Sequence, residues 1–208
     1  MYNISMKGSG EMTDFKLLEK ISEENNGVLQ TKEALKAGVS KAKLAEFLKE
    51  NEYEKFSRGI YYSPDTFDDK MYMLQLRFPQ IIFSHESALE LLEMTDQVPF
   101  HSTVTVKSGY NATNIKKENV DVYYIKEELH ELGMIKKKTM FGNEVWTYNA
   151  ERTICDLLRN KSDLDPRTFP EAIKEYVRSS DRDLTKLARY AEVFRVDKVL
   201  RPYLEVLL

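Results

Sequence analysis

One stretch of the chain, from Thr31 to Tyr62, constrains the fold most, because helix caps, a turn glycine and strand-like runs follow one another closely. Thr31 is a favoured N-cap residue for a short helix that runs to Leu35. Gly38 suits the left-handed conformation that ends such a helix. Ser40 follows two positions later, and we predict that it caps a second helix after a tight turn.

The second helix, predicted over residues 40–51, is amphipathic. Leu44, Phe47 and Leu48 recur at the i, i+3, i+4 spacing that places side chains on one face of a helix. We therefore expect these three side chains to pack into a core, with the opposite face of the helix turned to solvent or to a partner.

Two strand-like runs, Tyr53–Phe56 and Ile60–Tyr62, follow the second helix and predict a hairpin with Ser57-Arg58-Gly59 at its tip. Val28–Gln30 is a further short strand that we expect to pair with the hairpin, and residues 14–25 form the first predicted helix. Together these elements predict a winged helix-turn-helix, a shape that lays a helix into the major groove of DNA.

Basic and polar side chains of this stretch are the candidate DNA contacts. Those near the N-terminus of the second helix would face base edges, and those on the preceding helix and the hairpin would contact phosphates, with the arginine beside Gly59 entering a minor groove. The candidate DNA-binding residues are Lys36, Ser40, Lys41, Lys43, Lys49, Lys55 and Arg58. Glu46, on the same helix face, either accepts a hydrogen bond from cytosine or repels the DNA backbone.

The charge balance bears on this prediction. The chain carries a net charge of −3, and residues 1–64 hold as many Lys and Arg as Asp and Glu. Residues 31–49 nevertheless hold five Lys against two Glu, a local basic excess. A solvated face is the alternative for any single lysine, and some winged helices bind only proteins. We expect modest affinity for DNA, helped by binding to paired sites.

The pattern changes at Ser63-Pro64-Asp65, and we place a domain boundary there because Pro disfavours helix in the residue before it. The elements predicted beyond it are helices over 71–78, 85–93, 150–160, 168–179, 183–194 and 196–207, strands over 81–83, 102–106 and 120–125, and a hairpin over 134–148. The chain is thus predicted to be α+β: an N-terminal winged helix-turn-helix, then a mixed α/β domain ending in a helical bundle.

These boundaries give a flexible leader over residues 1–12, the winged helix-turn-helix domain over 13–66 and a second domain over 67–208. The 42% hydrophobic content is enough for a core in each domain. No apolar run approaches the ~20 residues of a membrane span, and no signal peptide is evident. The single cysteine agrees with a reducing compartment. We expect a cytoplasmic protein that has no membrane partner.

Residue patterns typical of enzymes give no catalytic site. The three histidines are dispersed without metal-ligand spacing, and no Gly-rich phosphate loop is present. Cys155 has no paired base and is expected in a core. Asp163 and Asp165 resemble the carboxylates that hold Mg²⁺ in nucleotidyltransferases, but a Gly-Ser turn is missing upstream, so a loop and helix-capping region explains them better. We predict no enzyme activity, no metal and no cofactor.

Several motifs continue beyond the hairpin in a distinctive order. They are Arg58-Gly59-Ile60-Tyr61, then Ser84-His85-Glu86-Ser87-Ala88-Leu89, Pro99, the strand from Thr103 to Val106, and Glu151-Arg152-Thr153-Ile154-Cys155-Asp156-Leu157-Leu158-Arg159. From about Thr13 to its C-terminus, the chain thereby resembles the AbiEi family, the antitoxins and transcriptional regulators of bacterial AbiE abortive-infection systems.

The resemblance implies a role in a type IV toxin–antitoxin system. The N-terminal winged helix would bind inverted repeats of double-stranded DNA in the promoter of its own operon and repress it. The C-terminal antitoxin domain would counteract a cognate AbiEii-type nucleotidyltransferase toxin encoded next to it, without a stable complex. The outcome would be phage defence through growth arrest of infected cells.

Two groups of charged residues in the second domain are candidates for the antitoxin surface. The first is spaced i, i+4, i+7 and forms either a polar stripe or a row of intrahelical ion pairs worth about 0.3 kcal/mol each. The second belongs to residues 174–201, where eight Lys and Arg outnumber five Asp and Glu; it would contact nucleic acid or an acidic toxin, or is a solvated face. The candidate residues are Arg152, Asp156, Arg159, Lys174, Arg178 and Arg182.

The main alternative is a one-component transcriptional regulator whose second domain senses a small ligand. Its aromatic residues would then line a pocket, although a core accounts for them as well. A nucleotidyltransferase gene next to this one would favour the antitoxin. A third, enzymatic interpretation requires Asp163 and Asp165 to hold a metal ion.

Overall fold

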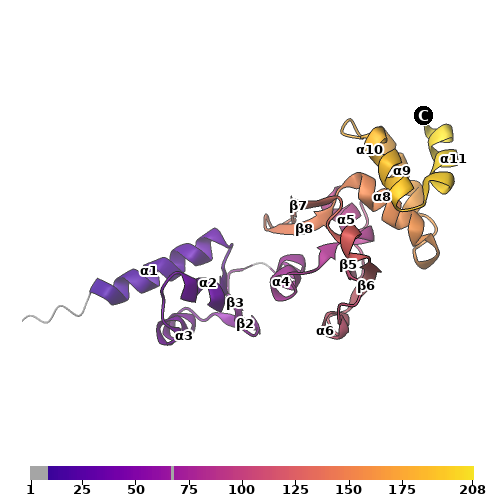
Figure 1. The fold of residues 1–208 in the computed structure, drawn as a ribbon. Coiled ribbons are helices and arrows are strands. Elements are labelled where there is room, and N and C mark those ends of the chain that lie inside the picture. The colour runs from indigo at the N-terminus through magenta and orange to yellow at the C-terminus, as the bar shows by residue number, and fades with distance from the viewer. Residues whose placement is uncertain (1–8, 67) are drawn as a thin grey trace, which may run out of the picture. The chain divides into compact units, whose positions relative to one another are not determined.

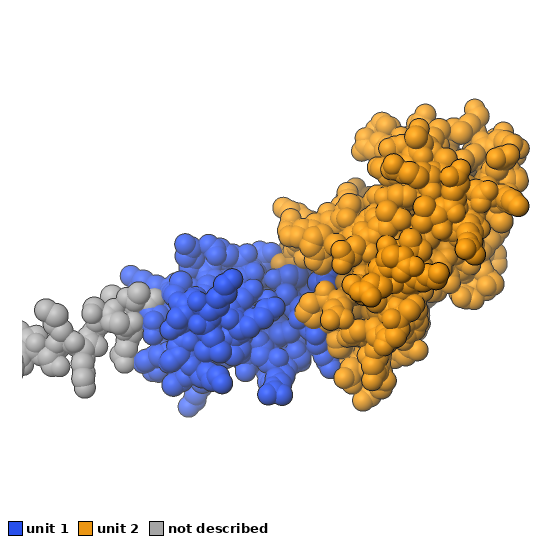
Figure 2. Space-filling view, in the orientation of Figure 1, with its two compact units in different colours: residues 1–77 blue, residues 78–208 orange. Residues whose placement is uncertain are grey.

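The computed structural model describes residues 9–66 and 68–208, and the chain divides into two compact units (Figures 1 and 2). Unit 1 spans Met1–Arg77 and unit 2 spans Phe78–Leu208. The protein is α+β, with a small sheet in unit 1 and a larger one in unit 2.

Unit 1 ends at Arg77, whereas we predicted the domain boundary after residue 66. The difference is helix α4 (Lys70–Arg77), which belongs to unit 1. Asp69 accepts a hydrogen bond from the Tyr72 amide at 3.0 Å and so caps the first turn of this helix. The Tyr72 hydroxyl donates to the side-chain oxygen of Asn25 at 3.5 Å, which ties α4 to the rest of unit 1.

The described part of unit 1 runs through a helix, a strand, two more helices and a hairpin. Before α4 its elements are α1 (Ser9–Glu24), β1 (Val28–Gln30), α2 (Thr31–Lys36), α3 (Lys41–Glu50), β2 (Glu54–Ser57) and β3 (Ile60–Tyr62). The strands form an antiparallel sheet in the order β1-β3-β2. Leu29 pairs with Tyr61 in this sheet, so the predicted pairing of residues 28–30 with the hairpin is confirmed.

Helix α1 begins earlier than we predicted. It starts at Ser9 rather than at Asp14, so residues 9–12 of the predicted leader belong to a helix. Residues 1–8 of that leader lie outside the described residues. The sequence signal was weak because Gly10 lies in this first turn, and Gly has low helix propensity.

The predicted cap of α2 is wrong and that of α3 is confirmed. Gln30 occupies the N-cap position of α2 and makes no side-chain cap; Thr31 is the first helical residue. The Thr31 amide instead donates to the Gly59 carbonyl at 2.8 Å, and so joins the helix to the hairpin. Ser40 caps α3, because its hydroxyl accepts from the Lys43 amide at 3.2 Å. Gly38, with φ of +94°, takes the predicted left-handed conformation.

The core of unit 1 lies between α1, α2, α3 and β1. Its buried side chains are Leu18, Leu29, Ala34, Val39, Leu44, Phe47 and Leu48. The predicted apolar face of α3 is therefore confirmed. The Phe47 ring packs edge-to-face on Phe15 with centroids 5.3 Å apart. Full burial of each large side chain stabilises the fold by about 1.5–3 kcal/mol, and it also holds the opposite face of α3 outward.

Unit 2 is built on a mixed sheet in the strand order β6-β5-β4-β8-β7. Its strands are β4 (Ile82–Phe83), β5 (Ser102–Lys107), β6 (Val120–Ile125), β7 (Met134–Lys138) and β8 (Glu144–Tyr148). Strand β5 is parallel to β6, and β4 is parallel to β8. The predicted hairpin over residues 134–148 is confirmed, since β7 and β8 pair antiparallel.

The helices of unit 2 confirm the predicted all-helical C-terminal region. Its main helices are α5 (His85–Leu91), α8 (Ala150–Arg159), α9 (Thr168–Arg178), α10 (Leu184–Val193) and α11 (Asp197–Leu207). Short helices that we did not predict are α6 (Thr113–Lys116), α7 (Glu127–His130) and the 3₁₀ turn η1 (Lys161–Asp163). The last three α-helices lie together beside α8 (Figure 1, orange to yellow) and share one apolar core with it.

Side-chain caps account for where two of these helices begin. The side chain of Asn149 accepts from the Arg152 amide at 3.0 Å and starts α8. Asp183 accepts from the Lys186 amide at 2.8 Å and starts α10.

Across residues 9–66 and 68–208, we find no helix with the length and apolar character that crossing a membrane requires.

Candidate functional site

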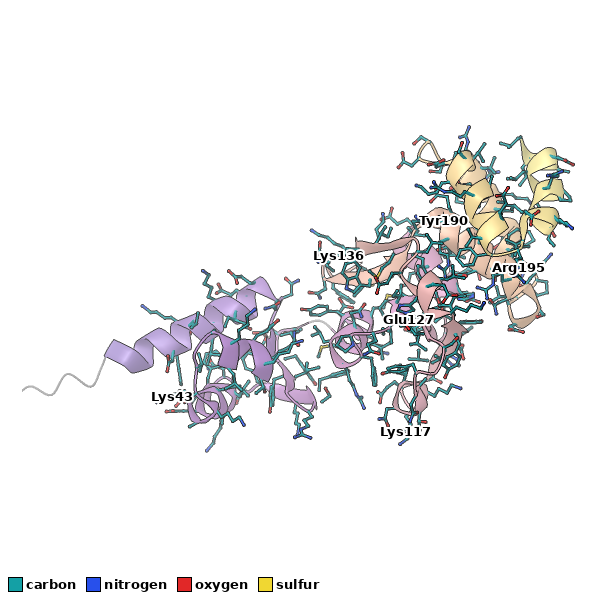
Figure 3. All side chains as sticks on the ribbon, viewed as in Figure 1. Lys43, Lys117, Glu127, Lys136, Tyr190 and Arg195 are labelled. Carbon is teal, nitrogen blue, oxygen red and sulfur yellow. The ribbon has the colours of Figure 1, made fainter. Side chains whose placement is uncertain are left out.

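The N-terminus of α3 holds three of the predicted DNA-binding residues. Ser40 and Lys41 are exposed at the start of the helix, and Lys43, labelled in Figure 3, lies one turn further along. The Ser40 hydroxyl accepts from the Lys43 amide, so this end of the helix is already capped. The N-terminus of a helix carries a partial positive charge, and exposed lysines beside it increase the attraction for phosphate.

Glu46 forms an ion pair within α3. Its carboxylate lies 2.9 Å from the Lys43 Nζ, in an exposed ion pair between positions i and i+3. The charge of Lys43 is therefore partly neutralised by Glu46. Lys49, near the C-terminal end of α3, is exposed.

The remaining predicted DNA contacts come from α2 and the hairpin. Lys36 ends α2, Lys55 lies in β2, and Arg58 lies in the turn between β2 and β3; all three are exposed. The pairing of β2 with β3 shifts register between Lys55 and Ser57. Such a bulge increases the local twist of a hairpin and turns its side chains. All seven predicted residues thus belong to α2, α3 and the hairpin of unit 1.

The predicted antitoxin surface divides into an exposed part and a buried part. Lys174 and Arg178 lie on α9, and Arg182 lies in the loop before α10; all three are exposed. Arg178 lies 3.9 Å from a Glu175 carboxylate oxygen, and Arg182 donates to the Ser179 carbonyl at 2.9 Å. These residues form an exposed basic segment.

Arg152 and Asp156 are buried, so our assignment of these two residues to the antitoxin surface is wrong. Arg152 has 0% and Asp156 has 2% of its surface exposed. The spacing prediction placed both on one helix face correctly, but α8 is covered on nearly all sides by other elements of unit 2. The Asp156 carboxylate accepts from Arg152 Nε at 2.8 Å and from Arg159 Nη1 at 3.3 Å. The ion-pair interpretation is confirmed, and of the three only Arg159 reaches solvent.

The Arg152 guanidinium is also held by backbone and by rings. Its Nη1 donates to the carbonyls of Leu129 and Leu132, each at 2.8 Å. The same group lies 4.1 Å from the ring centroids of both Tyr148 and Phe194, a cation–π contact on each. Arg152 therefore joins α8 to β8, to α7 and the segment after it, and to the C-terminal end of α10. This is a structural role in the core of unit 2.

Cys155 and Asp165 were among the residues considered for catalysis, and the structure places them in different surroundings. Cys155 is fully buried, and burial raises the pKa of its thiol to about 12, so the nucleophilic thiolate does not form near neutral pH. Asp165 accepts two hydrogen bonds from the Arg167 guanidinium, which lower the pKa of its carboxyl to about 2. Within the described part of the chain, no three His, Cys, Asp or Glu side chains gather where they could share a metal ion.

A buried polar cluster around His85 was not predicted. Ser84 and His85 are exposed by 1% or less, and the Ser84 Oγ lies 2.9 Å from His85 Nδ1 and accepts from the Thr105 hydroxyl at 2.9 Å. The His85 ring stacks on Tyr123 with centroids 3.7 Å apart. Burial lowers the pKa of His85 below its usual value of 6.5. The Thr105–Ser84 hydrogen bond joins the residue before α5 to β5.

A hollow in unit 2 is the other feature that the sequence did not indicate. It has a volume of about 320 Å³ and lies between α5, the loop before β5, and the start of α9. Its walls include Glu86, Leu89, Phe100, Asp121 and Glu171. These five residues come from four separate parts of unit 2, and spacing along the chain cannot show that they meet.

Comparisons with known proteins bear on the fold alone. No family model matches the chain, and no curated protein matches it. Among solved structures, the chain is similar to the RV2827C protein from Mycobacterium tuberculosis, with a TM-score of 0.58 and 10% sequence identity. The similarity covers 86% of this chain and 71% of that protein. At this identity the likeness shows a shared fold.

Proposed function

We propose that this protein is the antitoxin of a bacterial abortive-infection toxin–antitoxin system and binds its own promoter through unit 1. The observation that carries the proposal is the arrangement of α3. One face of the helix is buried by Leu44, Phe47 and Leu48, and the other presents exposed basic side chains beside a Ser40-capped N-terminus. The order of helices and hairpin in unit 1 supports a winged helix-turn-helix.

In this proposal the N-terminus of α3 enters the major groove. Lys41 and Lys43 would reach base edges or phosphates, while Lys36, Lys49 and Lys55 would contact the DNA backbone on either side. Arg58, in the hairpin turn, would enter the neighbouring minor groove. Because few phosphates are contacted by one copy, two copies on an inverted repeat would provide useful affinity.

Unit 2 would counteract a cognate nucleotidyltransferase toxin encoded beside it. The exposed basic segment of Lys174, Arg178 and Arg182 supports this part of the proposal, as does the resemblance to the AbiEi family. Arg159 is the exposed member of the α8 ion-pair row. We propose a functional partnership rather than a stable complex, and a protein that has no catalytic activity and needs no cofactor.

A promoter fusion tests the regulatory half of the proposal. The DNA upstream of this gene is placed before a reporter, and repression by the full chain is compared with that by a Lys41→Ala/Lys43→Ala variant. We expect the variant to lose most of the repression. Lys20→Ala is the matched control, because Lys20 is an exposed lysine of α1 paired with Glu24 at 3.8 Å. Equal repression by all three proteins would contradict the assignment of α3.

A growth assay tests the antitoxin half separately. The neighbouring nucleotidyltransferase gene is induced with either the full chain or residues 1–77 present. Growth should recover only with the full chain, because the proposed antitoxin residues lie in unit 2. Recovery with unit 1 alone would show that repression is sufficient.

The hollow in unit 2 favours one second candidate, a one-component regulator that senses a small ligand. The two candidate functions differ in the neighbouring gene that they require. An antitoxin requires a toxin gene next to its own, and a one-component regulator does not.

A further inference from the structure

The hollow between α5, the loop over residues 92–101 and α9 has the size of a small-molecule site. Its volume of about 320 Å³ lies at the lower end of the ~300–1,000 Å³ typical of ligand pockets. Leu89, Met94 and Ala172 contribute apolar surface to it. It therefore suits a molecule with a compact apolar body.

Two large apolar side chains lie exposed at the rim of the hollow. Phe100 is fully exposed and Val98 is 79% exposed, and both line the hollow. Exposed large apolar side chains beside a concavity commonly mark a binding site. The face of an aromatic ring also attracts a cation through its quadrupole.

The charges around the hollow are mostly negative. Four carboxylates line it, against a single guanidinium, that of Arg167. This guanidinium is already taken by Asp165, through N–H donors at 3.1 and 3.0 Å. The other three carboxylates are those of Glu86, Asp121 and Glu171.

These three carboxylates have weak partners among the described residues. Asp121 lies 3.7 Å from His101 Nδ1, and Glu171 accepts from the Gln97 amide at 3.5 Å. The Oε2 of Glu86 is buried and has no hydrogen-bond partner in the described chain. Burial raises the pKa of Glu86, a hydrogen bond from its own backbone amide lowers it, and the charge of Asp121 raises it further, so the net shift is upward.

We propose that this hollow binds a small organic cation, a protonated amine or guanidinium carried on an apolar or aromatic body. The cationic group would lie near Glu86 and Asp121 and offset their negative charge. The body would contact Leu89 and Met94 inside and the Phe100 ring at the rim. A bare metal ion fits less well, because no three candidate ligands gather among the described residues. The proposal rests on unit 2 alone and is independent of DNA binding.

Calorimetric titration of the full chain tests the site. The probes are 2-phenylethylamine, agmatine and, as the uncharged counterpart of the first, 2-phenylethanol. We expect 2-phenylethylamine to bind with a Kd of about 1 mM or tighter, a modest value for so small a ligand, and 2-phenylethanol to bind at least about tenfold more weakly. Equal binding of amine and alcohol would show an apolar hollow without cation selectivity, and would overturn the proposal.

Variants locate the site. Glu86→Gln and Asp121→Asn should each weaken amine binding by about tenfold, whereas Glu128→Gln, an exposed carboxylate of α7 outside the hollow, should leave it unchanged. Phe100→Ala serves as a second test, because removal of a fully exposed side chain leaves the fold intact. Phe100→Ala should weaken the binding of 2-phenylethylamine more than the binding of agmatine. No heat signal with either amine, or full binding by Glu86→Gln and Phe100→Ala, would contradict the assignment.

Discussion

Two ion pairs at helical spacing, one in each unit, differ in what they do. Lys43 and Glu46 on α3 are three residues apart and reach solvent, although Lys43 is half-buried, and Arg152 and Asp156 on α8 are four residues apart and buried. The sequence signal is nearly the same in both. The exposed pair leaves a lysine that another anion can take over, whereas the buried pair is closed by backbone carbonyls and aromatic rings. Spacing predicts that two charges meet, and burial decides their role.

The largest expected effect tests the buried pair. Arg152→Ala should lower the free energy of unfolding of unit 2 by about 3–5 kcal/mol, because it leaves the Asp156 charge buried with only Arg159 beside it. Chemical denaturation followed by circular dichroism measures the loss.

A double variant sharpens this prediction. Arg152→Met combined with Asp156→Leu removes both charges and fills the space with apolar groups, so it should recover much of the stability lost in Arg152→Ala. If Arg152→Ala were as stable as the parent chain, the guanidinium would not hold α8 in place.

The next effect is a pH dependence of stability from histidine titration. We expect it in unit 2, since residues 1–77 contain no histidine. Burial lowers the pKa of His85 and of His130 in the folded state, so the unfolded chain binds more protons as the pH falls. Stability should therefore be full above pH 6.5, the usual pKa of histidine, and decline below it. The free energy of unfolding should fall by at most about 1.4 kcal/mol per pH unit for each histidine.

His85→Asn should reduce this slope by the share of one histidine. Asparagine tolerates the positive φ of +49° at this position better than most residues do. Denaturation midpoints measured from pH 8 to pH 5 compare the variant with the parent, and parallel curves would exclude His85 as a source of the dependence.

A smaller effect is expected at the start of α3. Ser40→Ala removes the side-chain cap on the Lys43 amide and should cost about 1 kcal/mol of stability in unit 1. Ser40→Gly, which costs only a few tenths of a kcal/mol at such positions, is the matched comparison. Thermal denaturation of residues 1–77 measures both, and equal stability of parent and Ser40→Ala would show that the cap contributes nothing.

The smallest stability effect is expected for the exposed pair. Lys43→Ala should change the free energy of unfolding by less than about 1 kcal/mol, as is usual for exposed ion pairs. Lys43→Ala should nevertheless weaken operator binding and change the preference between bases. Lys55→Ala should instead weaken binding to DNA of every sequence about equally. Gel-shift titrations against the operator and against single-base variants separate these two outcomes. Equal losses for every sequence with both variants would mean that α3 does not read bases.

Much of the secondary structure was predictable because its signals are local. The apolar spacing of Leu44, Phe47 and Leu48 and the cap at Ser40 identified α3, and alternating residues identified β6. The cap of α2 was misassigned because the Thr31 amide bonds to Gly59 across the sheet, a partner far along the chain. The exposure of a helix face was the least predictable property.

The candidate sites show the same limit. Residues of the proposed DNA-binding surface lie within one stretch of the chain, so local patterns can list them. Arg152 looked like a surface residue because charged side chains usually are, and its burial depends on Leu129, Tyr148 and Phe194. The hollow joins residues from Glu86 to Ala172. Only the tertiary fold brings these residues together, so local sequence patterns could not predict the lining of the hollow.

The most direct test of the proposed function is a titration of the full chain against the DNA upstream of its own gene, beside a scrambled duplex, at several salt concentrations. The proposal predicts preference for the native duplex and an affinity that falls steeply with salt, because lysines on α2, α3 and the hairpin release counterions from the phosphates they contact. Equal binding of both duplexes, or no binding at low salt, would contradict DNA recognition by unit 1.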